Sequence, residues 1–199
     1  MRVLRYLKGT IDVGITYRKE NSDSLGALVD CGKGCDSNNL AELLSMGDAD
    51  FAQDVDTRKS TTGYVVTYAG GAISWLSKLQ PVVSQSTTEA EYIAVNNLAR
   101  EVVWLQQLFE DMGIPLTQPV LKSDNNGCIA ISRDPALHSR SKHIDVKYHY
   151  IRNLVLAGTV KIEYLNTKLM AADMFTKALP RDTFQLHCAT IGLSTYVPP

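Results

Sequence analysis

The chain has 199 residues, of which 45% are hydrophobic and 21% charged, and its formal net charge is −1 at pH 7. A chain of this length and composition can bury one substantial core, so it needs neither a disulfide nor a metal ion to fold. The near-zero net charge excludes an overall basic field. Any contact with nucleic acid must therefore come from a local cluster of Lys and Arg.

The cysteines and the apolar segments bear on the cellular setting. The four cysteines are scattered, at positions 31, 35, 128 and 188, and no signal peptide precedes them. We therefore expect free thiols in a reducing, intracellular environment. The longest apolar stretches are too short to span a bilayer, so we expect a soluble protein without membrane contact.

The first part of the chain is predicted to form a short helix and a strand. Residues 2–9 have helical apolar spacing that ends at Gly9, and residues 13–17 alternate as a strand does. Residues 18–42 are polar and contain several Gly and Asn. We interpret this segment as a loop or insertion.

A β-hairpin is predicted next. The β-rich runs 62–68 and 72–76 are separated by Gly70-Gly71, which is a tight-turn signal. Residues 81–84 are a candidate for a further strand.

The clearest helix is predicted over residues 86–112. Thr87 or Thr88 can cap its start, no Pro or Gly interrupts it, and Gly113 with Pro115 ends it.

The last part of the chain alternates between strands and helices. Residues 120–123 are typical of a buried strand, a short helix follows, and 144–156 are predicted as an amphipathic helix before the strand 160–165. A hairpin followed by alternating strands and helices indicates an α/β fold, in which helices cover a mixed sheet.

Four carboxylates stand out by their positions relative to these elements. Asp48 closes a strand candidate, Asp124 follows a strand, Glu91 lies on the long helix, and Asp173 opens a late helix. Oxygen ligands from separate elements suit hard cations such as Mg²⁺ and two-metal phosphodiester cleavage. We therefore take these four as candidate catalytic and metal-binding residues.

The long helix offers two acidic residues, and helical periodicity distinguishes them. Glu91 shares the face of Val95, which is predicted to pack on the sheet, whereas Glu89 lines up with Asn96 and Arg100 on the polar side. We predict that Glu91 points inward and that Glu89 is a first-turn acid favoured by the helix dipole.

A calcium-binding loop is an alternative for one acidic segment. Four aspartates recur there at short spacing: Asp48, Asp50, Asp54 and Asp56. Counted from Asp48, however, the sixth residue is Gln53 rather than Gly, and the twelfth is Lys59 rather than Glu. We therefore interpret Asp54 and Asp56 as turn acids.

A series of short motifs covers the chain from Asp48 onward: 47–52 (GDADFA), 56–64 (DTRKSTTGY), 73–75 (ISW), 78–81 (KLQP), 86–92 (STTEAEY), 123–125 (SDN), 142–145 (KHID), 172–173 (AD) and 175–180 (FTKALP). In this order they resemble the ribonuclease H region of copia-type LTR retrotransposon Pol polyproteins. Residues 4–10 resemble the end of the connection that follows reverse transcriptase in those polyproteins.

The resemblance implies a ribonuclease H-like fold with a five-stranded mixed sheet, and hydrolysis of the RNA strand of RNA–DNA hybrids during reverse transcription. It implies that Asp48, Glu91, Asp124 and Asp173 hold two Mg²⁺ ions, with Mn²⁺ as the alternative. The implied partners are the hybrid and the reverse transcriptase portion of the same polyprotein. The implied location is the cytoplasm or a virus-like particle.

The resemblance also suggests how the chain is divided. Residues 1–42 correspond to the upstream connection plus an insertion, 43–180 to the ribonuclease H-like domain, and 181–199 to a C-terminal helix and tail. The family runs almost directly into the first catalytic strand, whereas here residues 27–46 intervene and Gly47 weakens the strand. Asp30 is a rival for that strand end.

A basic run near the predicted late helix is the candidate nucleic-acid contact. Four residues are proposed to contact phosphates: Arg140, Lys142, His143 and Lys147. The alternative is a solvated helix face. A zinc site built from Cys31, Cys35, His138 and His143 is disfavoured, because the two pairs lie in separate segments.

The sequence leaves alternatives to a hybrid-specific nuclease open. One is a catalytically inactive ribonuclease H-like module that binds nucleic acid or supports the reverse transcriptase. Another is a different nuclease of the same broad fold.

Overall fold

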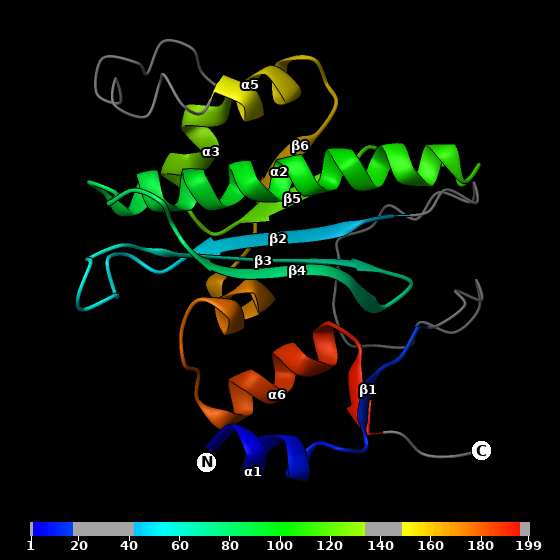
Figure 1. The fold of residues 1–199 in the computed structure, drawn as a ribbon. Helices are drawn as coiled ribbons and strands as arrows, with labels where there is room; N and C mark the ends of the chain where they lie inside the picture. The colour runs from blue at the N-terminus through cyan, green and yellow to red at the C-terminus, as the bar shows by residue number, and fades with distance from the viewer. Residues whose placement is uncertain (1, 18–41, 134–148, 196–199) are drawn as a thin grey trace.

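A computed structural model describes residues 2–17, 42–133 and 149–195, and its centre is a five-stranded sheet (Figure 1). The strand order is β4-β3-β2-β5-β6. The first three strands in this order pair antiparallel, and β2, β5 and β6 pair parallel. The bounds are β2 Leu44–Ala49, β3 Thr61–Tyr68, β4 Gly71–Leu79, β5 Val120–Ser123 and β6 Lys161–Tyr164. This mixed sheet with flanking helices confirms the predicted ribonuclease H-like α/β fold.

Helices cover both faces of the sheet (Figure 1). The long helix α2 lies across one face together with α3 and α5, and the short helix η3 lies against the other face, with α6 beyond it. The helical bounds are α1 Arg2–Gly9, α2 Thr87–Asp111, α3 Asn126–Arg133, α5 His149–Leu156, η2 Thr167–Leu169, η3 Ala171–Phe175 and α6 Arg181–Thr190. None of the helices in the described part of the chain has the length and apolar character that a membrane crossing requires.

Alternation along the central strands divides the core into two layers. In β3, Tyr64 and Val66 join the cluster that packs under α2, whereas Val65 joins the cluster on the η3 side. Successive side chains of a strand point to opposite faces, which explains why a nearly continuous apolar run serves both layers.

The start of α2 differs from the predicted cap. Ser86, rather than Thr87 or Thr88, is the N-cap, and its Oγ accepts a hydrogen bond from the Glu89 backbone N–H at 3.1 Å. The Glu89 carboxylate accepts from the Gln85 backbone N–H at 2.7 Å. The first-turn role predicted for Glu89 is therefore correct, and the acid and the Ser hydroxyl together satisfy helix-end donors.

The prediction that one face of α2 is polar and exposed is wrong for two of its residues. Glu89 and Asn96 are buried, with 6% and 3% of their surfaces exposed. The reason is that α2 packs against α3 and α5 as well as against the sheet, so its buried arc is wider than a single sheet-facing stripe.

The strand predicted at 81–84 is also wrong, because residues 81–82 form a bend and 83–84 have no regular secondary structure. The buried Gln80 holds this segment: its amide nitrogen donates to Thr62 Oγ1 at 3.1 Å and to the Ala90 carbonyl at 3.0 Å. The Ser84 hydroxyl donates to the Gln80 side-chain oxygen at 3.0 Å. A buried polar side chain, rather than a strand ladder, therefore connects the hairpin to α2.

The described residues include only the end of the expected insertion at residues 27–46. Leu44 already begins β2, so the last residues of that range belong to the central strand. Gly47 lies within β2 opposite Tyr64 of β3, and a Cβ at this position would lie 3.2 Å from Leu98 Cδ2. The missing side chain lets α2 approach the sheet closely.

A second, two-stranded sheet joins the two ends of the described chain. The strand β1, Val13–Ile15, pairs antiparallel with β7, Leu193–Thr195. The predicted strand at 13–17 therefore exists over its first three residues, but it lies outside the main sheet. The Tyr17 hydroxyl donates to the Ala72 carbonyl at 2.7 Å, which attaches this small sheet to the beginning of β4.

Substitution of a glycine in β3 can test how closely η3 packs on the sheet. A Cβ at Gly63 would lie 2.6 Å from Thr176 Cγ2 and 2.9 Å from the Ala172 carbonyl oxygen. We expect Gly63→Ala to lower the free energy of unfolding by about 1–3 kcal/mol, measured by urea denaturation. The control is Gly14→Ala in β1, where nothing lies within 4 Å of the added Cβ. Equal effects of the two substitutions would contradict the close packing of η3.

Candidate active site

Two of the predicted acids meet because of how β2 and β5 pair. The strands run parallel, with Met46 opposite Lys122. Two residues further along each strand direction come Asp48, near the end of β2, and Asp124, just after β5. The carboxyl ends of parallel strands share one edge of a sheet, so this register places the two acids side by side.

The long helix adds Glu91 to this pair. One carboxylate oxygen each from Asp48, Glu91 and Asp124 lies within 4.8 Å of the other two. Glu91 is 93% buried, and its Oε2 has no hydrogen-bond partner among the described residues. A cation would offset the cost of burying this oxygen without a donor, and three converging carboxylates match the oxygen donors that Mg²⁺ and Mn²⁺ prefer. The donor set therefore fits a divalent ion.

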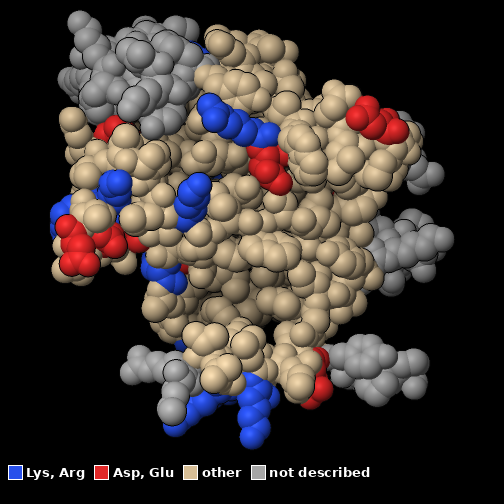
Figure 2. Space-filling view, viewed as in Figure 1, with Lys and Arg blue, Asp and Glu red and all other residues tan. Residues whose placement is uncertain are grey.

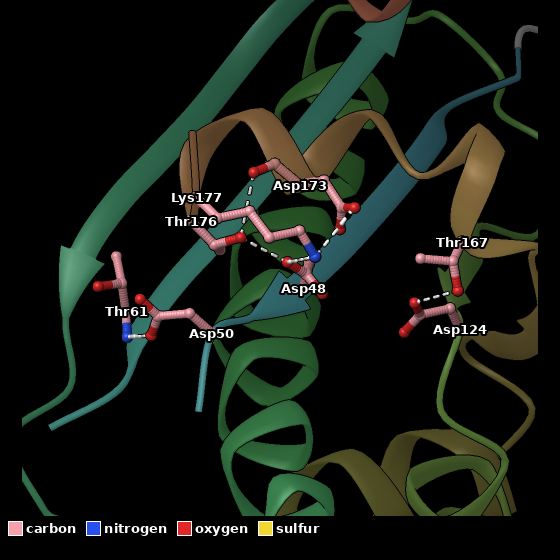
Figure 3. Close-up of polar contacts among 8 residues, drawn as sticks. All are labelled: Asp48, Asp50, Thr61, Asp124, Thr167, Asp173, Thr176 and Lys177. Carbon is pink, nitrogen blue, oxygen red and sulfur yellow. Dashed lines mark hydrogen bonds and ion pairs between the residues drawn. The ribbon is translucent and has the colours of Figure 1, made fainter. Parts of the chain in front are cut away.

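The fourth predicted acid, Asp173, joins the site through a lysine (Figure 3). Lys177 Nζ lies 3.0 Å from Asp173 Oδ2 and 3.9 Å from Asp48 Oδ2. The Thr176 hydroxyl donates to Asp48 Oδ2 at 2.5 Å. The short helix η3 and the residues just after it thus bring one acid, one base and one hydroxyl against the end of β2.

Asp124 lies at the open side of the site. It is half-buried, and its Oδ2 accepts a hydrogen bond from the Thr167 hydroxyl at 2.7 Å (Figure 3). This bond orients the carboxylate, and its partial exposure leaves it accessible from solvent.

The crowding of carboxylates alters their acidity. Burial, followed by the charges of Asp48 and Asp124, raises the pKa of Glu91 to about 10. Burial and the charge of Asp48 raise the pKa of Asp173 to about 7, although Lys177 acts in the opposite direction. Burial disfavours the charged form of Lys177, but the neighbouring carboxylates outweigh it and raise its pKa. The acids resist ionisation here because like charges are held close together in a buried site.

Sequence reasoning missed three residues that contact the acids: Thr167, Thr176 and Lys177. A signal for the lysine was present, because it follows Asp173 by four residues, a spacing that places two side chains on one helical face. Thr176 and Lys177 also lie in the motif at 175–180, whereas no sequence signal marks Thr167, whose contact depends on how η2 folds back onto the sheet.

The remaining acids of the first acidic segment have other roles. Asp54 accepts hydrogen bonds from the Thr57 backbone N–H at 2.7 Å and from its hydroxyl at 2.6 Å, as predicted for a turn acid. Asp50 accepts from the Thr61 backbone N–H (Figure 3). These contacts agree with rejecting a calcium loop.

Several candidate residues lie outside the described residues, and the structure does not test them. They are the proposed phosphate contacts Arg140, Lys142, His143 and Lys147, the rival acid Asp30, and the disfavoured zinc ligands Cys31, Cys35 and His138.

Comparison with known proteins finds relatives that match the whole chain. It is 40% identical over 191 residues to the retrovirus-related Pol polyprotein from transposon TNT 1-94 of Nicotiana tabacum, a match covering 96% of the chain and 13% of the polyprotein. It is 41% identical over 199 residues to the Pol polyprotein from transposon RE1 of Arabidopsis thaliana, covering 100% of the chain and 12% of that polyprotein. The chain therefore spans about an eighth of the length of these relatives.

One solved structure that overlaps the chain is the N-terminal RNase H domain of rv2228c from Mycobacterium tuberculosis, fused to maltose-binding protein. The overlap covers 74% of this chain and 96% of that one, with a TM-score of 0.46 and 12% identity. No model of a known protein family matches the chain.

The strand order and the acidic cluster define a ribonuclease H-like domain with an acidic site at the end of its central strands. The relatives point to a narrower group of proteins within this class. Over nearly its whole length the chain is similar to one segment of retrotransposon Pol polyproteins, which agrees with the resemblance seen in its motifs.

The raised pKa of Glu91 predicts how pH affects stability without metal. The folded chain retains this proton where the unfolded chain has lost it, so the free energy of unfolding falls as the pH rises from 4.5 toward about 10. We expect Glu91→Gln, which cannot ionise, to raise the Tm in EDTA at pH 8 by about 3 °C or more, and by less at pH 5.

Circular dichroism melts of both proteins at the two pH values measure this effect. Glu110→Gln is the matched control, because Glu110 lies on the exposed part of the same helix. A Tm difference between Glu91→Gln and wild type that does not grow with pH would contradict the prediction.

Proposed function

We propose that the chain is a metal-dependent endonuclease that hydrolyses the RNA strand of RNA–DNA hybrids. The observation that carries the proposal is the convergence of Asp48, Glu91 and Asp124 within 4.8 Å at the end of the central strands, with a buried Glu91 oxygen that lacks a donor. Similarity to a segment of Pol polyproteins supports it, because reverse transcription by another part of such a polyprotein would produce hybrids of this kind.

In this proposal Asp48, Glu91, Asp124 and Asp173 hold divalent ions, Mg²⁺ first and Mn²⁺ as the alternative. Bound ions of this kind would supply Lewis-acid stabilisation of a phosphodiester and a water of lowered pKa. The protein's part is to hold the ligands in place and to limit water around them. The buried Glu91 and Asp48 form the closed side of the site, and the half-buried Asp124 faces the side open to a nucleic acid.

Hydroxyl donors keep the ligands oriented. The Thr176 hydroxyl holds Asp48 Oδ2, and the Thr167 hydroxyl holds Asp124 Oδ2. Such supporting hydrogen bonds fix ligand geometry in metal sites, and their loss costs about 10–100-fold in affinity or activity.

Recognition of the hybrid would use charge and sugar chemistry. On the face shown in Figure 2, Lys and Arg are scattered among acids. We assign phosphate contacts to Arg140, Lys142, His143 and Lys147, and the choice of RNA to 2′-hydroxyl contacts across the minor groove.

A cleavage assay tests the proposal. With a labelled hybrid and Mg²⁺, we expect the wild-type chain to cut the RNA strand, and Asp124→Asn to lower the rate by at least about 100-fold, because it removes a ligand rather than a supporting bond. Asp56→Asn is the matched control, because Asp56 is an exposed acid outside the cluster. It should leave the rate unchanged.

The same assay separates the alternatives. Mg²⁺-dependent cleavage no faster than that of Asp124→Asn would favour a catalytically inactive module and overturn the proposal. Cleavage of duplex DNA at the rate of the hybrid would favour a different nuclease of this fold.

A further inference from the structure

The two sides of the carboxylate cluster are not equivalent. On one side, Asp48, Glu91 and Asp124 face one another with no described cation among them, and Glu91 Oε2 has no hydrogen-bond partner. On the other side, between Asp48 and Asp173, the ammonium group of Lys177 lies 3.9 Å and 3.0 Å from their oxygens. A positive charge from the chain itself therefore occupies one side of the cluster.

The Lys177 contact differs from an ordinary surface ion pair. The side chains of Asp48 and Asp173 are only 3% and 6% exposed, whereas exposed pairs contribute little because water screens both partners. Removing one partner of a buried pair leaves an uncompensated charge, which is strongly unfavourable. Lys177 therefore keeps two buried carboxylates together while no other cation lies between them.

The Lys177 ammonium group is able to leave its position between the two carboxylates. Its side chain is 33% exposed and sits on a flexible four-carbon stem, so solvent is within reach of the ammonium group. Asp173 Oδ1 is buried and has no hydrogen-bond partner, so this oxygen is free to bind another cation. Asp48 keeps its hydrogen bond from the Thr176 hydroxyl whether or not the ammonium is present.

We propose that Lys177 is a built-in competitor for the second metal ion. The chain then holds one divalent ion on Asp48, Glu91 and Asp124 in the absence of nucleic acid. A second ion binds between Asp48 and Asp173 only when it displaces the Lys177 ammonium. The inference rests on the proposed function, because it assumes that the cluster binds divalent ions. It makes Lys177 a positioning residue that sets how many ions the free protein carries.

Metal binding without nucleic acid provides the test. Free Mn²⁺ is measured by electron paramagnetic resonance while the protein is titrated, so the readout does not depend on activity. We expect one bound ion per wild-type chain and two per Lys177→Met chain, with the second binding at least about 10-fold more tightly than in wild type. Lys177→Arg keeps the charge and should keep one ion.

A control and a second measurement accompany the titration. Lys168→Met removes an exposed lysine from the neighbouring η2 and should leave one ion bound. In EDTA, Lys177→Met should melt at a lower temperature than wild type, and Mn²⁺ should restore its Tm. Metal would then replace the missing ammonium.

The outcomes distinguish the inference from the proposed function. Two ions that bind the wild-type chain with equal affinity in the absence of nucleic acid would overturn the inference and leave the proposed function intact, and this result needs no variant to fold. A single ion on a folded Lys177→Met chain would also overturn it. No Mn²⁺ binding to any chain would overturn the proposed metal-dependent function, and the inference with it.

Discussion

Carboxylates that are buried close together repel one another, and the structure around Asp48 is organised by that repulsion. Asp48 and Asp173 lie on either side of the Lys177 ammonium, which offsets their charge. Glu91 has no such partner within 2–17, 42–133 or 149–195, and burial together with the charges of Asp48 and Asp124 raises its pKa to about 10. The chain thus holds acids where they resist ionisation, and a bound cation relieves this cost.

The backbone makes this crowding possible. Parallel pairing of β2 with β5 aligns Asp48 and Asp124 at one edge of the sheet, and α2 carries Glu91 over that edge. Two glycines let the flanking helices come close: Gly47 lies against Leu98 of α2, and Gly63 against Thr176 and the η3 backbone. A side chain at either glycine would push a helix, and with it a ligand, away from the site.

Local signals predicted much of the fold. The hairpin turn at Gly70-Gly71, the long helix and the alternating end of the chain all depend on neighbouring residues, and the structure contains each of them. The secondary-structure predictions were wrong where contacts between residues far apart in the sequence determine the structure. Residues 81–84 do not form a strand, because Gln80 donates hydrogen bonds to Thr62 and to the Ala90 carbonyl. Asn96 is buried because α2 also packs against other helices.

By itself, the sequence determined the candidate acids and the resemblance to Pol polyproteins, because ordered motifs and helical or strand periodicity are properties of nearby residues. Tertiary structure alone decided which acids converge and which of them lie beside Lys177. Asp173 and Lys177 are four residues apart, so their proximity could be predicted from the sequence. Asp48, however, lies more than a hundred positions earlier in the chain. It comes close to them only because η3 packs against β2 and β3, and no local sequence pattern predicts that packing.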